Sequence, residues 1–345
     1  MATAKGTILV TGANGGLGSA IARHIASKPE FSSYRGIYTV RDATRAPALT
    51  AALEGTTHPH DIVSLELTDL DSVRRAAETI NGRVSAGEIP PIRALILNAG
   101  SQDFGNQTWT AQGLDTTFAS NYLGQWLLTV LLLKSLDKQA GRIVVLGSQA
   151  HDPNDPRNDM TGAFKKPEHK TLITDAARFE AIAKGEWSSK TEDATFTGGF
   201  RRYGASKLCL VMMQHELQAR LNHDPALGNI SVLGVDPGAM STGMARQGPW
   251  FIRVLVMKII YPALLWLNPN IGFARLTSRS ASDVLEAAFK AGGEDELPKD
   301  QYFDGTTPLE TSEESRDPAK RKLVWEGSVK LTGLKEGETV LADWQ

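Results

Sequence analysis

Tyr203 and Lys207 are the two side chains of this sequence whose types and spacing most directly indicate chemistry. They stand four residues apart, so on a helix they share one face. A free tyrosine has a pKa of about 10 and is a poor proton donor or acceptor at neutral pH. One positive charge about 4 Å from a phenolate, at an effective dielectric constant near 20, stabilises it by about 4 kcal/mol. The spacing therefore predicts an acid/base tyrosine whose pKa is lowered by a lysine.

A glycine-rich turn follows a short apolar segment near the start of the chain. Thr7–Val10 has the composition of a strand buried on both faces of a parallel sheet. Residues 11–18 then read TGANGGLG, and residues 19–26 have the apolar spacing of a helix. In such a unit the glycines let the backbone approach a pyrophosphate, and the helix N-terminus offers unpaired N–H groups and a positive dipole. The segment predicts a dinucleotide site.

The TGxxxGxG spacing at residues 11–18 and the YxxxK spacing at residues 203–207 together resemble the short-chain dehydrogenase/reductase family. Either motif alone is compatible with a turn without a ligand or with an exposed helical pair, whereas both in this order favour the family. The resemblance covers residues 7–242. It implies an α/β fold with a Rossmann-like, doubly wound parallel sheet. We expect a single domain, residues 1–345, with a long insertion before Tyr203 and a carboxy-terminal extension.

The resemblance also implies cofactor contacts at the ends of several predicted strands. A buried-strand pattern at residues 94–97 leads into an Asn-Ala-Gly motif, and one at residues 232–236 leads into PGxxxT. In the family, the first motif supports the sheet beside the adenosine half of the cofactor, and the second contacts the nicotinamide carboxamide. The implied cofactor-binding residues are Gly12, Asn14, Gly16, Leu17, Gly18, Arg41, Glu66, Leu67, Asn98, Ala99, Gly100, Tyr203, Lys207, Pro237, Gly238, Met240 and Thr242.

The end of the second predicted strand, residues 36–40, bears on the choice between NAD and NADP. An NAD site usually has an acidic residue there, but this chain has Val40 followed by Arg41. A guanidinium matches a phosphate bidentately, so Arg41 favours NADP(H). Asp42 leaves two alternatives open, because it could neutralise Arg41 or bind the ribose itself. Glu66 stands where the family usually has an aspartate for the adenine amino group.

Two further residues complete a catalytic set with Tyr203 and Lys207. Asn121 matches the helical asparagine that in the family holds a water linking the lysine to solvent. Ser148 follows the strand pattern at residues 142–147, at the position of the family's carbonyl-orienting hydroxyl. A lone serine or asparagine at such a position is usually a cap or a turn former. The order Asn121, Ser148, Tyr203, Lys207 favours the catalytic interpretation.

Composition sets the broad class of protein. The chain has 345 residues, of which 41% are hydrophobic and 22% charged, enough for one large core. A net charge of −2 argues against nucleic acid or an anionic membrane as an electrostatic partner. The single cysteine, Cys209, excludes an intramolecular disulfide and indicates a buried thiol. The first strand begins by residue 7, which leaves no room for a secretory signal, so we expect a cytoplasmic protein. We predict no metal site.

The segment 149–202 is an insertion relative to the shortest family members. It contains a predicted short helix, capped by Thr174 and stopped by Gly185, and it closes with the glycine pair before Arg201. Both its ends are joined to catalytic residues, so we place it near the active-site mouth, with a surface excursion as the alternative. His151, beside a turn, is interpreted as a local hydrogen-bonding residue rather than a catalytic one.

The segment 243–280 contains the most apolar stretch of the chain, residues 249–267. Arg253 and Lys258 would each cost about 2.5 to 3.5 kcal/mol near the centre of a membrane helix, and Pro262 would break it, which argues against a span. In the family this position forms the substrate lid, and an apolar lid implies an apolar substrate. Peripheral contact with an intracellular membrane and packing in a homodimer remain alternatives.

The carboxy-terminal part is predicted to contain a helix from Ala281 and an edge strand at residues 301–305. The tail, residues 306–345, includes a further helix at residues 317–326. A Tyr-Phe strand followed by such a helix resembles the retinol-dehydrogenase-like branch of the family, and the whole chain resembles its elongated fungal members.

The resemblance implies an NADP(H)-dependent oxidoreductase that interconverts a carbonyl and an alcohol on a hydrophobic small molecule. Polyketide-, sterol- and retinoid-like substrates all fit. Tyr203 would exchange the proton, Ser148 would orient the substrate oxygen, and Lys207 would bind the nicotinamide ribose and tune Tyr203. One alternative is an isomerisation or cyclisation with bound NADP. The other is an NADP-binding sensor or scaffold without turnover, against which the intact catalytic set argues.

Overall fold

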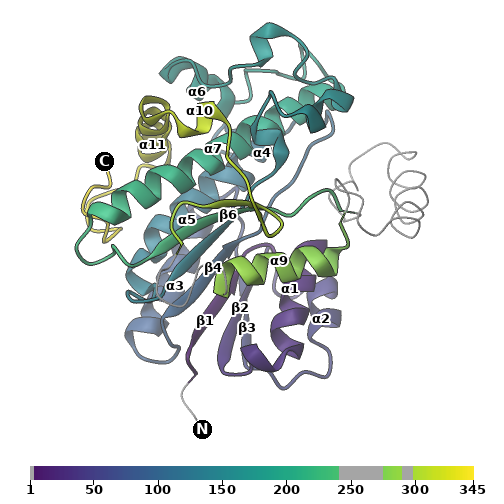
Figure 1. The fold of residues 1–345 in the computed structure, drawn as a ribbon. Helices are drawn as coiled ribbons and strands as arrows, with labels where there is room; N and C mark the ends of the chain where they lie inside the picture. Colours follow the sequence, from purple (N-terminus) through teal and green to yellow (C-terminus); the bar gives the residue numbers. More distant parts are fainter. Residues whose placement is uncertain (1–3, 241–274, 290–297) are drawn as a thin grey trace.

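A single sheet forms the centre of the computed structural model, which describes residues 4–240, 275–289 and 298–345 (Figure 1). Within these residues its strand order is β3-β2-β1-β4-β5-β6-β7-β8. β8 pairs antiparallel with β7, and the other neighbouring strands pair in parallel. The strands are β1 Gly6–Val10, β2 Tyr34–Val40, β3 His60–Ser64, β4 Ile92–Leu97, β5 Arg142–Leu146, β6 Ser231–Asp236, β7 Tyr302–Asp304 and β8 Thr307–Pro308. The predicted doubly wound α/β fold is confirmed.

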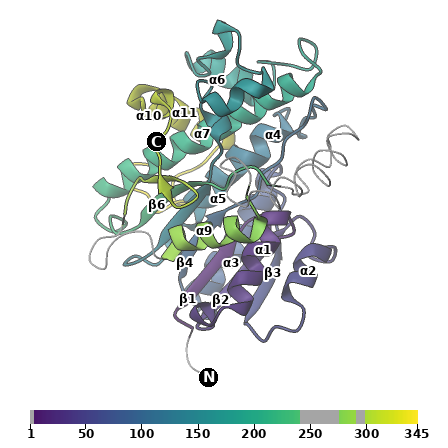
Figure 2. The same cartoon turned by 45° about the vertical axis from the view of Figure 1, so that its right-hand side comes forward.

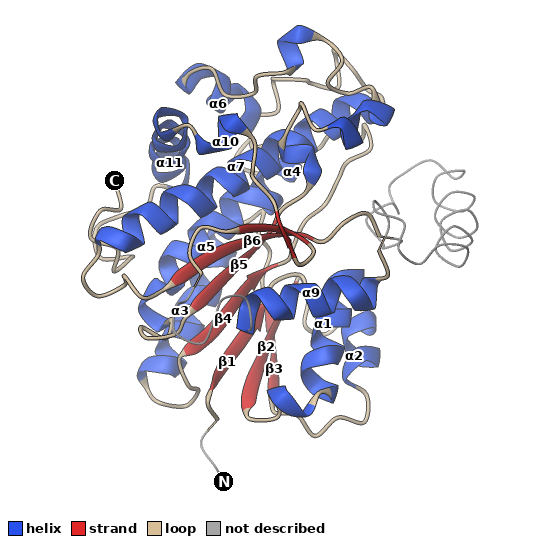
Figure 3. Ribbon diagram, in the orientation of Figure 1, coloured by secondary structure: helices blue, strands red, loops and turns tan. Residues whose placement is uncertain are grey.

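Helices cover both faces of the sheet (Figures 2 and 3). One face packs against α1 Gly16–Ser27, α2 Pro47–Leu53 and α9 Thr277–Phe289; the other packs against α3 Leu70–Ser85, α5 Gly124–Leu132 and α7 Phe196–His223. Shorter or more peripheral helices are α4 Thr116–Phe118, α6 Ala176–Ala183, α10 Glu313–Arg316 and α11 Pro318–Thr332. Short 3-10 helices are η1 Pro29–Phe31, η3 Leu133–Ser135, η4 Gln149–His151, η5 Pro156–Thr161 and η6 Pro167–His169, and η2 Ala119–Leu123 is a π-helix.

The strand β1 shows why the sequence pattern specifies a two-sided core. Successive side chains of a strand point to opposite faces. Ile8 and Val10 pack among the buried side chains on the α1 side, whereas Leu9 packs on the α5 side, and all three are completely buried. A strand buried on both faces needs apolar residues at every position, as residues 8–10 have.

The carboxy-terminal extension packs across α5 and α7, so that α10 and α11 lie beside α7 in Figure 1. The rings of Trp126 and Trp325 meet edge to face with 5.1 Å between centroids. The hydroxyls of Tyr122 and Ser328 form a buried hydrogen bond of 2.6 Å. The extension is therefore an integral part of the core on this side of the sheet.

The predicted elements of the insertion and the tail are present with shifted ends. The insertion helix is α6, but its N-cap is Asp175, which accepts a hydrogen bond from the N–H of Arg178, and not Thr174. The glycines before Arg201, with which the predicted insertion closes, lie in the first turn of α7, which begins at Phe196. The tail helix α11 starts after its N-cap Asp317, as predicted.

Membrane spanning was tested on the part of the chain that the structure describes. No helix there is both long enough and apolar enough to cross a bilayer. The apolar stretch 249–267, and with it most of the predicted lid 243–280, lies outside the described residues.

Candidate active site

Tyr203 and Lys207 lie on the buried amino-terminal half of α7, which passes the carboxyl end of β5. Helical spacing places the Nζ atom of Lys207 5.7 Å from the centroid of the Tyr203 ring. The same ammonium donates a hydrogen bond of 2.8 Å to the carbonyl oxygen of Leu146, the last residue of β5. The predicted pair therefore lies at the carboxyl end of β5, where the sequence also predicts Ser148.

Burial controls the protonation of both groups. It raises the pKa of Tyr203 to about 12, although the neighbouring Ser148 side chain lowers this pKa. It lowers the pKa of Lys207 to about 8. The net pKa of Tyr203 is raised because the cost of desolvating the phenolate dominates. That Lys207 lowers this pKa stays a prediction. In both cases burial favours the neutral form of the group over its charged form.

Ser148 lies directly beyond β5 and faces Tyr203. Its hydroxyl oxygen caps the turn η4 by accepting a hydrogen bond of 3.2 Å from the N–H of Ala150. The Ser148 side chain also lowers the pKa of Tyr203, so the two groups that would share a substrate oxygen are neighbours. The structure thus brings the predicted hydroxyl and phenol together.

Asn121 lies in the π-helix η2 and links the loop after β4 to α7. Its Oδ1 accepts from the N–H of Ser101 at 2.7 Å, and its Nδ2 donates to the carbonyl of Ser101 at 2.8 Å. Nδ2 also donates to the hydroxyl of Ser206 at 3.0 Å. A Cβ on Gly100 would lie 3.5 Å from Nζ of Lys207 and 3.6 Å from Oδ1 of Asn121. The side chain of Asn121 therefore positions the loop, and the relay water stays a prediction.

The glycine turn has the close packing that a dinucleotide cradle requires. Gly12 has a φ of 64°, and a Cβ there would lie 2.8 Å from Cα of Ala99. A Cβ on Gly18 would overlap the carbonyl oxygen of Gly12 and lie 2.8 Å from Nδ2 of Asn98. That Nδ2 atom donates to the carbonyl of Thr11 at 2.7 Å. The Asn-Ala-Gly motif after β4 thus packs against the glycine turn and stabilises it.

The first turn of α1 presents backbone N–H groups that no described side chain caps. The helix starts at Gly16 after the N-cap Gly15, which makes no side-chain hydrogen bond. The N–H groups of Gly16, Leu17 and Gly18 belong to the first turn, which has no intrahelical acceptors. Together with the glycine packing, this donor set fits a pyrophosphate.

Asn14 supports the neighbouring helix. Its Oδ1 accepts hydrogen bonds from the N–H groups of Ala48 and Leu49, at 2.9 and 3.2 Å. It thereby caps α2, whose own N-cap Ala46 provides no side-chain hydrogen bond. The predicted cofactor contact of Asn14 stays a prediction, and its visible role is to fix the segment 42–48 beside the glycine turn.

Arg41 pairs with Glu66, the other residue expected at the adenosine end. Nε of Arg41 lies 3.2 Å from Oε2 of Glu66, and the arginine side chain is 78% exposed. The other oxygen of Glu66 accepts from the N–H and hydroxyl of Thr68. Asp42 accepts from the N–H and hydroxyl of Thr44 instead. Of the two alternatives for Asp42, neutralising Arg41 is therefore not the arrangement seen.

The remaining predicted cofactor residues lie at the ends of β3 and β6. Leu67 is buried against Gly124 of α5. Gly238 has a φ of 73° and donates its N–H to Oδ1 of Asp236 at 2.9 Å. The carbonyl of Pro237 accepts from the hydroxyl of Ser280 at 2.7 Å, and Met240 packs partly buried against the α1 side of the core. Thr242 lies outside the described residues.

Asp236 and Arg157 form a charged pair at the site that the sequence interpretation missed. Asp236 ends β6, is 2% exposed, and lies 3.5 Å from Nη1 of Arg157, which comes from the insertion. The same nitrogen lies 3.2 Å from Oδ2 of Asp304 on β7. Burial raises the pKa of Asp236, and its carboxylate in turn raises the pKa of both Tyr203 and Lys207. The one sequence signal was an acidic residue directly before the Pro-Gly motif.

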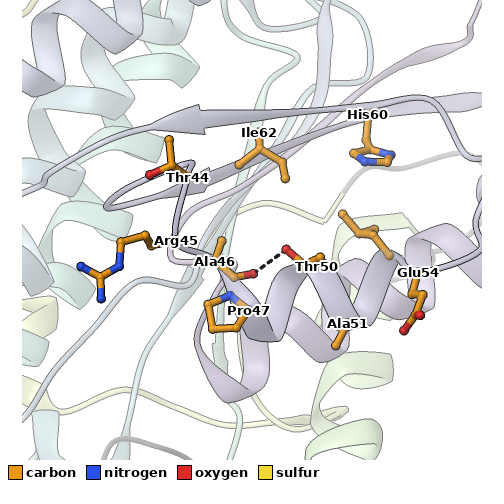
Figure 4. A pocket seen from close by; sticks show the side chains of 10 residues that line it. Thr44, Arg45, Ala46, Pro47, Thr50, Ala51, Glu54, His60 and Ile62 are labelled. Atoms are coloured by element: carbon orange, nitrogen blue, oxygen red, sulfur yellow. Dashed lines mark hydrogen bonds between the residues drawn. The ribbon is translucent and has the colours of Figure 1, made fainter.

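An open groove of about 770 Å³ lies elsewhere, between α2 and the edge strand β3 (Figure 4). Its lining includes Arg45, Glu54, His60 and Ile62. The groove contains none of the predicted catalytic residues, which lie in η2, in α7 and just beyond β5. It is therefore not the predicted substrate site.

Comparison with known proteins was made on sequence and on structure. The family model described as short chain dehydrogenase matches residues 6–162. The chain is 41% identical to the short-chain dehydrogenase iccH of Talaromyces variabilis, over 99% of both proteins. It is 27% identical to the chloroplastic protochlorophyllide reductase of Daucus carota, over 96% of this chain and 79% of that protein.

Several solved structures share the fold. An uncharacterized protein from Mycobacterium paratuberculosis aligns with a TM-score of 0.63 and 23% identity, over 96% of this chain and 95% of that one. NADPH-bound carbonyl reductase from chicken fatty liver aligns with a TM-score of 0.58 and 18% identity, over 89% of this chain and 99% of that one. The angucycline C-6 ketoreductase LanV with bound NADP aligns with a TM-score of 0.56 and 18% identity, over 88% of this chain and 95% of that one. At these identities the likeness shows the fold alone.

Proposed function

The chain belongs to the short-chain dehydrogenase family, and on that premise we propose that it is an NADP(H)-dependent oxidoreductase acting on a hydrophobic small molecule. It interconverts a carbonyl group and the corresponding alcohol. That it is an oxidoreductase using NAD or NADP follows from the family. The choice of NADP(H), the reaction and the substrate class are the proposal.

One observation carries the proposal: Ser148, Tyr203 and Lys207 meet at the carboxyl end of β5. The Ser148 side chain is near enough to Tyr203 to lower its pKa, and Lys207 holds its ammonium 5.7 Å from the Tyr203 ring. This set can polarise a carbonyl oxygen through Ser148 and deliver a proton from Tyr203. Because the pKa of Tyr203 is raised to about 12, the phenol carries at neutral pH the proton that the reducing direction requires.

The residues around the glycine turn would hold the cofactor. The first-turn N–H groups of α1 would take the pyrophosphate, and Arg41 would take the 2′-phosphate that distinguishes NADP from NAD. Bound NADPH supplies a hydride to the substrate carbon. Two solved proteins with the same fold are named with NADPH or NADP bound, which agrees with this choice.

The substrate class rests on sequence. The apolar stretch 249–267 stands where the family has its substrate lid, so it supports a hydrophobic substrate. Polyketide-, sterol- and retinoid-like carbonyl compounds fit this description. Arg253 and Lys258 within the stretch leave peripheral membrane contact and a homodimer interface as further proposals.

Isotope transfer tests the proposed reaction. The purified protein is incubated with NADPH deuterated at C4 of the nicotinamide and with a panel of apolar ketones and aldehydes. We expect deuterium at the new carbinol carbon, which mass spectrometry of the product measures. Conversion of a compound without deuterium uptake would instead indicate isomerisation or cyclisation. Tight NADPH binding with no conversion across the panel would favour a sensor or scaffold.

A further inference from the structure

We propose that His151 is a positioning residue, which fixes the catalytic Ser148 by tying it to the carboxy-terminal extension at Ser312. The inference rests on the proposed function, because the role assigned to Ser148 comes from it. His151 acts through the backbone of Ser148.

The imidazole of His151 makes one hydrogen bond on each side. Its Nδ1 donates to the carbonyl oxygen of Ser148 at 2.7 Å, and its Nε2 accepts from the N–H of Ser312 at 3.1 Å. A carbonyl only accepts and a backbone N–H only donates, so these partners require the neutral ring with its proton on Nδ1. The side chain is 2% exposed, so bulk water does not compete for these two hydrogen bonds.

Three segments far apart in the sequence enclose the ring. It belongs to η4, it packs 5.4 Å from the ring of Tyr302 on β7, and it meets Ser312 at the start of α10. The charged groups that act on it are Asp152 and Asp155 of the insertion and Asp236 of β6. Burial nevertheless lowers the pKa of His151, so the ring stays neutral at pH 7.

The bond to Ser312 adds something that the local turn does not provide. The backbone N–H of His151 already donates to the carbonyl of Ser148 at 3.0 Å, which closes η4. The turn η4 also packs against α7, and the carbonyl of Gln149 accepts a hydrogen bond of 3.0 Å from Nδ2 of Asn158. The Nε2 bond anchors it to a segment 161 residues away. Small displacements of reacting groups cost large factors in rate, so an anchor for Ser148 has a catalytic consequence.

The anchor itself is well held. Glu314, in the same short helix, accepts hydrogen bonds from the N–H groups of Leu172 and Ile173 in the insertion. The hydroxyl of Ser312 accepts from the N–H of Ser315 at 3.2 Å. Ser312 is thus fixed to the insertion and to α10, and it can hold His151 in place.

A matched pair of variants at Ser312 isolates the single N–H group. Ser312→Pro removes the N–H, and the φ of −55° at this position suits proline. Ser312→Ala keeps the N–H and loses the same capping hydroxyl. Hydrogen exchange of the Ala150 amide, which donates to the Ser148 hydroxyl, reports on the position of that hydroxyl. Turnover of NADPH with a ketone and the Kd for NADPH complete the measurement.

We expect Ser312→Pro to speed exchange at Ala150 and to lower kcat, each at least tenfold relative to Ser312→Ala, with the Kd for NADPH changed less than twofold. His151→Asn, which removes the Nε2 acceptor, should match the proline variant and add nothing to it in the double variant. Unchanged exchange at Ala150 overturns the inference, whatever the activity. Faster exchange with unchanged kcat also overturns it, because His151 is then only structural. If exchange responds but the wild-type chain turns over no substrate, the link to Ser148 stands and the proposed function fails.

Discussion

Arg41 and Glu66 form an ion pair across the ends of two neighbouring strands, with 3.2 Å between Nε and Oε2. Val40 and Ser64 are paired in the sheet, so the residues that follow β2 and β3 leave it side by side. Both were expected to bind the adenosine half of the cofactor, the arginine through a phosphate and the glutamate through the adenine. Under the proposed function, the 2′-phosphate of NADP would compete with the Glu66 carboxylate for the Arg41 guanidinium.

The competition predicts opposite effects of two substitutions on cofactor choice. Arg41→Ala should weaken NADPH binding by about 1 to 3 kcal/mol and leave NADH binding nearly unchanged, since only NADPH has the phosphate to lose. Glu66→Gln should strengthen NADPH binding by a few fold, because an exposed ion pair contributes little and its loss frees the guanidinium. Titration calorimetry with both cofactors measures the effects.

Arg75 provides the control for this experiment. It pairs with Asp69 at 3.5 Å in a similarly exposed position. Arg75→Ala should leave the affinities for NADPH and NADH unchanged. Equal weakening of both cofactors by Arg41→Ala would contradict the assignment of the 2′-phosphate to Arg41.

The elements that position the site could be predicted from sequence because their signals are local. The apolar run Thr7–Val10 needs no knowledge of its neighbours to indicate a two-sided strand. A Cβ at Gly12 or Gly18 would clash with backbone atoms, so the spacing of these glycines alone predicts the tight turn. The order of Ser148, Tyr203 and Lys207 gave the catalytic set, which the structure gathers at one strand end.

The partners of the charged and polar side chains could not be predicted, because they depend on tertiary contacts. Arg157 in the insertion meets Asp236 on β6, and His151 meets Ser312, with no spacing rule that links either pair. The raised net pKa of Tyr203 could not be predicted for the same reason. Coulomb attraction can be estimated from helical spacing, but burial of both groups is a property of the whole fold.

Tyr203→Phe tests the acid/base assignment. The substitution removes the phenolic oxygen and almost no volume, so the protein should fold and bind NADPH normally. Turnover should fall by orders of magnitude, because the proton donor is lost. Steady-state kinetics with any carbonyl substrate, together with NADPH titration, separates the two effects. Retention of most of the activity would show that another group donates the proton.

Lys207→Ala should differ from the tyrosine variant by weakening cofactor binding as well. The family resemblance gives Lys207 the nicotinamide ribose, and the structure places its ammonium on the carbonyl of Leu146 beside Tyr203. We expect a higher Kd for NADPH and a lower kcat in the same variant. A loss of kcat at unchanged Kd would limit Lys207 to its effect on the tyrosine.

Trp325 tests whether the carboxy-terminal extension stabilises the core. Its side chain is 1% exposed, packs edge to face on Trp126, and donates its indole N–H to the carbonyl of Trp344. Trp325→Ala should lower the free energy of unfolding by about 3 to 5 kcal/mol, as for other buried aromatic residues. Trp109 is 43% exposed, and Trp109→Ala should cost about 1 kcal/mol or less. Urea unfolding compares the two, and equal losses would contradict a specific role of the extension.

Asp236 tests the electrostatic control of Tyr203. Its buried carboxylate raises the pKa of Tyr203, so Asp236→Asn should move the pH–rate limb that belongs to the phenol toward lower pH. Asp304→Asn is the matched control. It removes another carboxylate bound to the same Arg157, but one that does not act on Tyr203, so the limb should stay in place. An identical shift in both variants would mean that the net charge of the cluster, rather than Asp236, sets the protonation of Tyr203.

The same variant has a predicted signature in stability. Because burial raises the pKa of Asp236 in the folded state, the folded protein binds this proton more tightly than the unfolded chain. Its contribution to the free energy of unfolding therefore decreases as pH rises from about 3.9 through the raised folded-state pKa. Asp236→Asn removes the titrating group, so the difference between variant and wild type in urea unfolding should change in favour of the variant across this interval and level off above it. A difference that is independent of pH would show that Asp236 is not protonated more readily in the folded protein than in the unfolded chain.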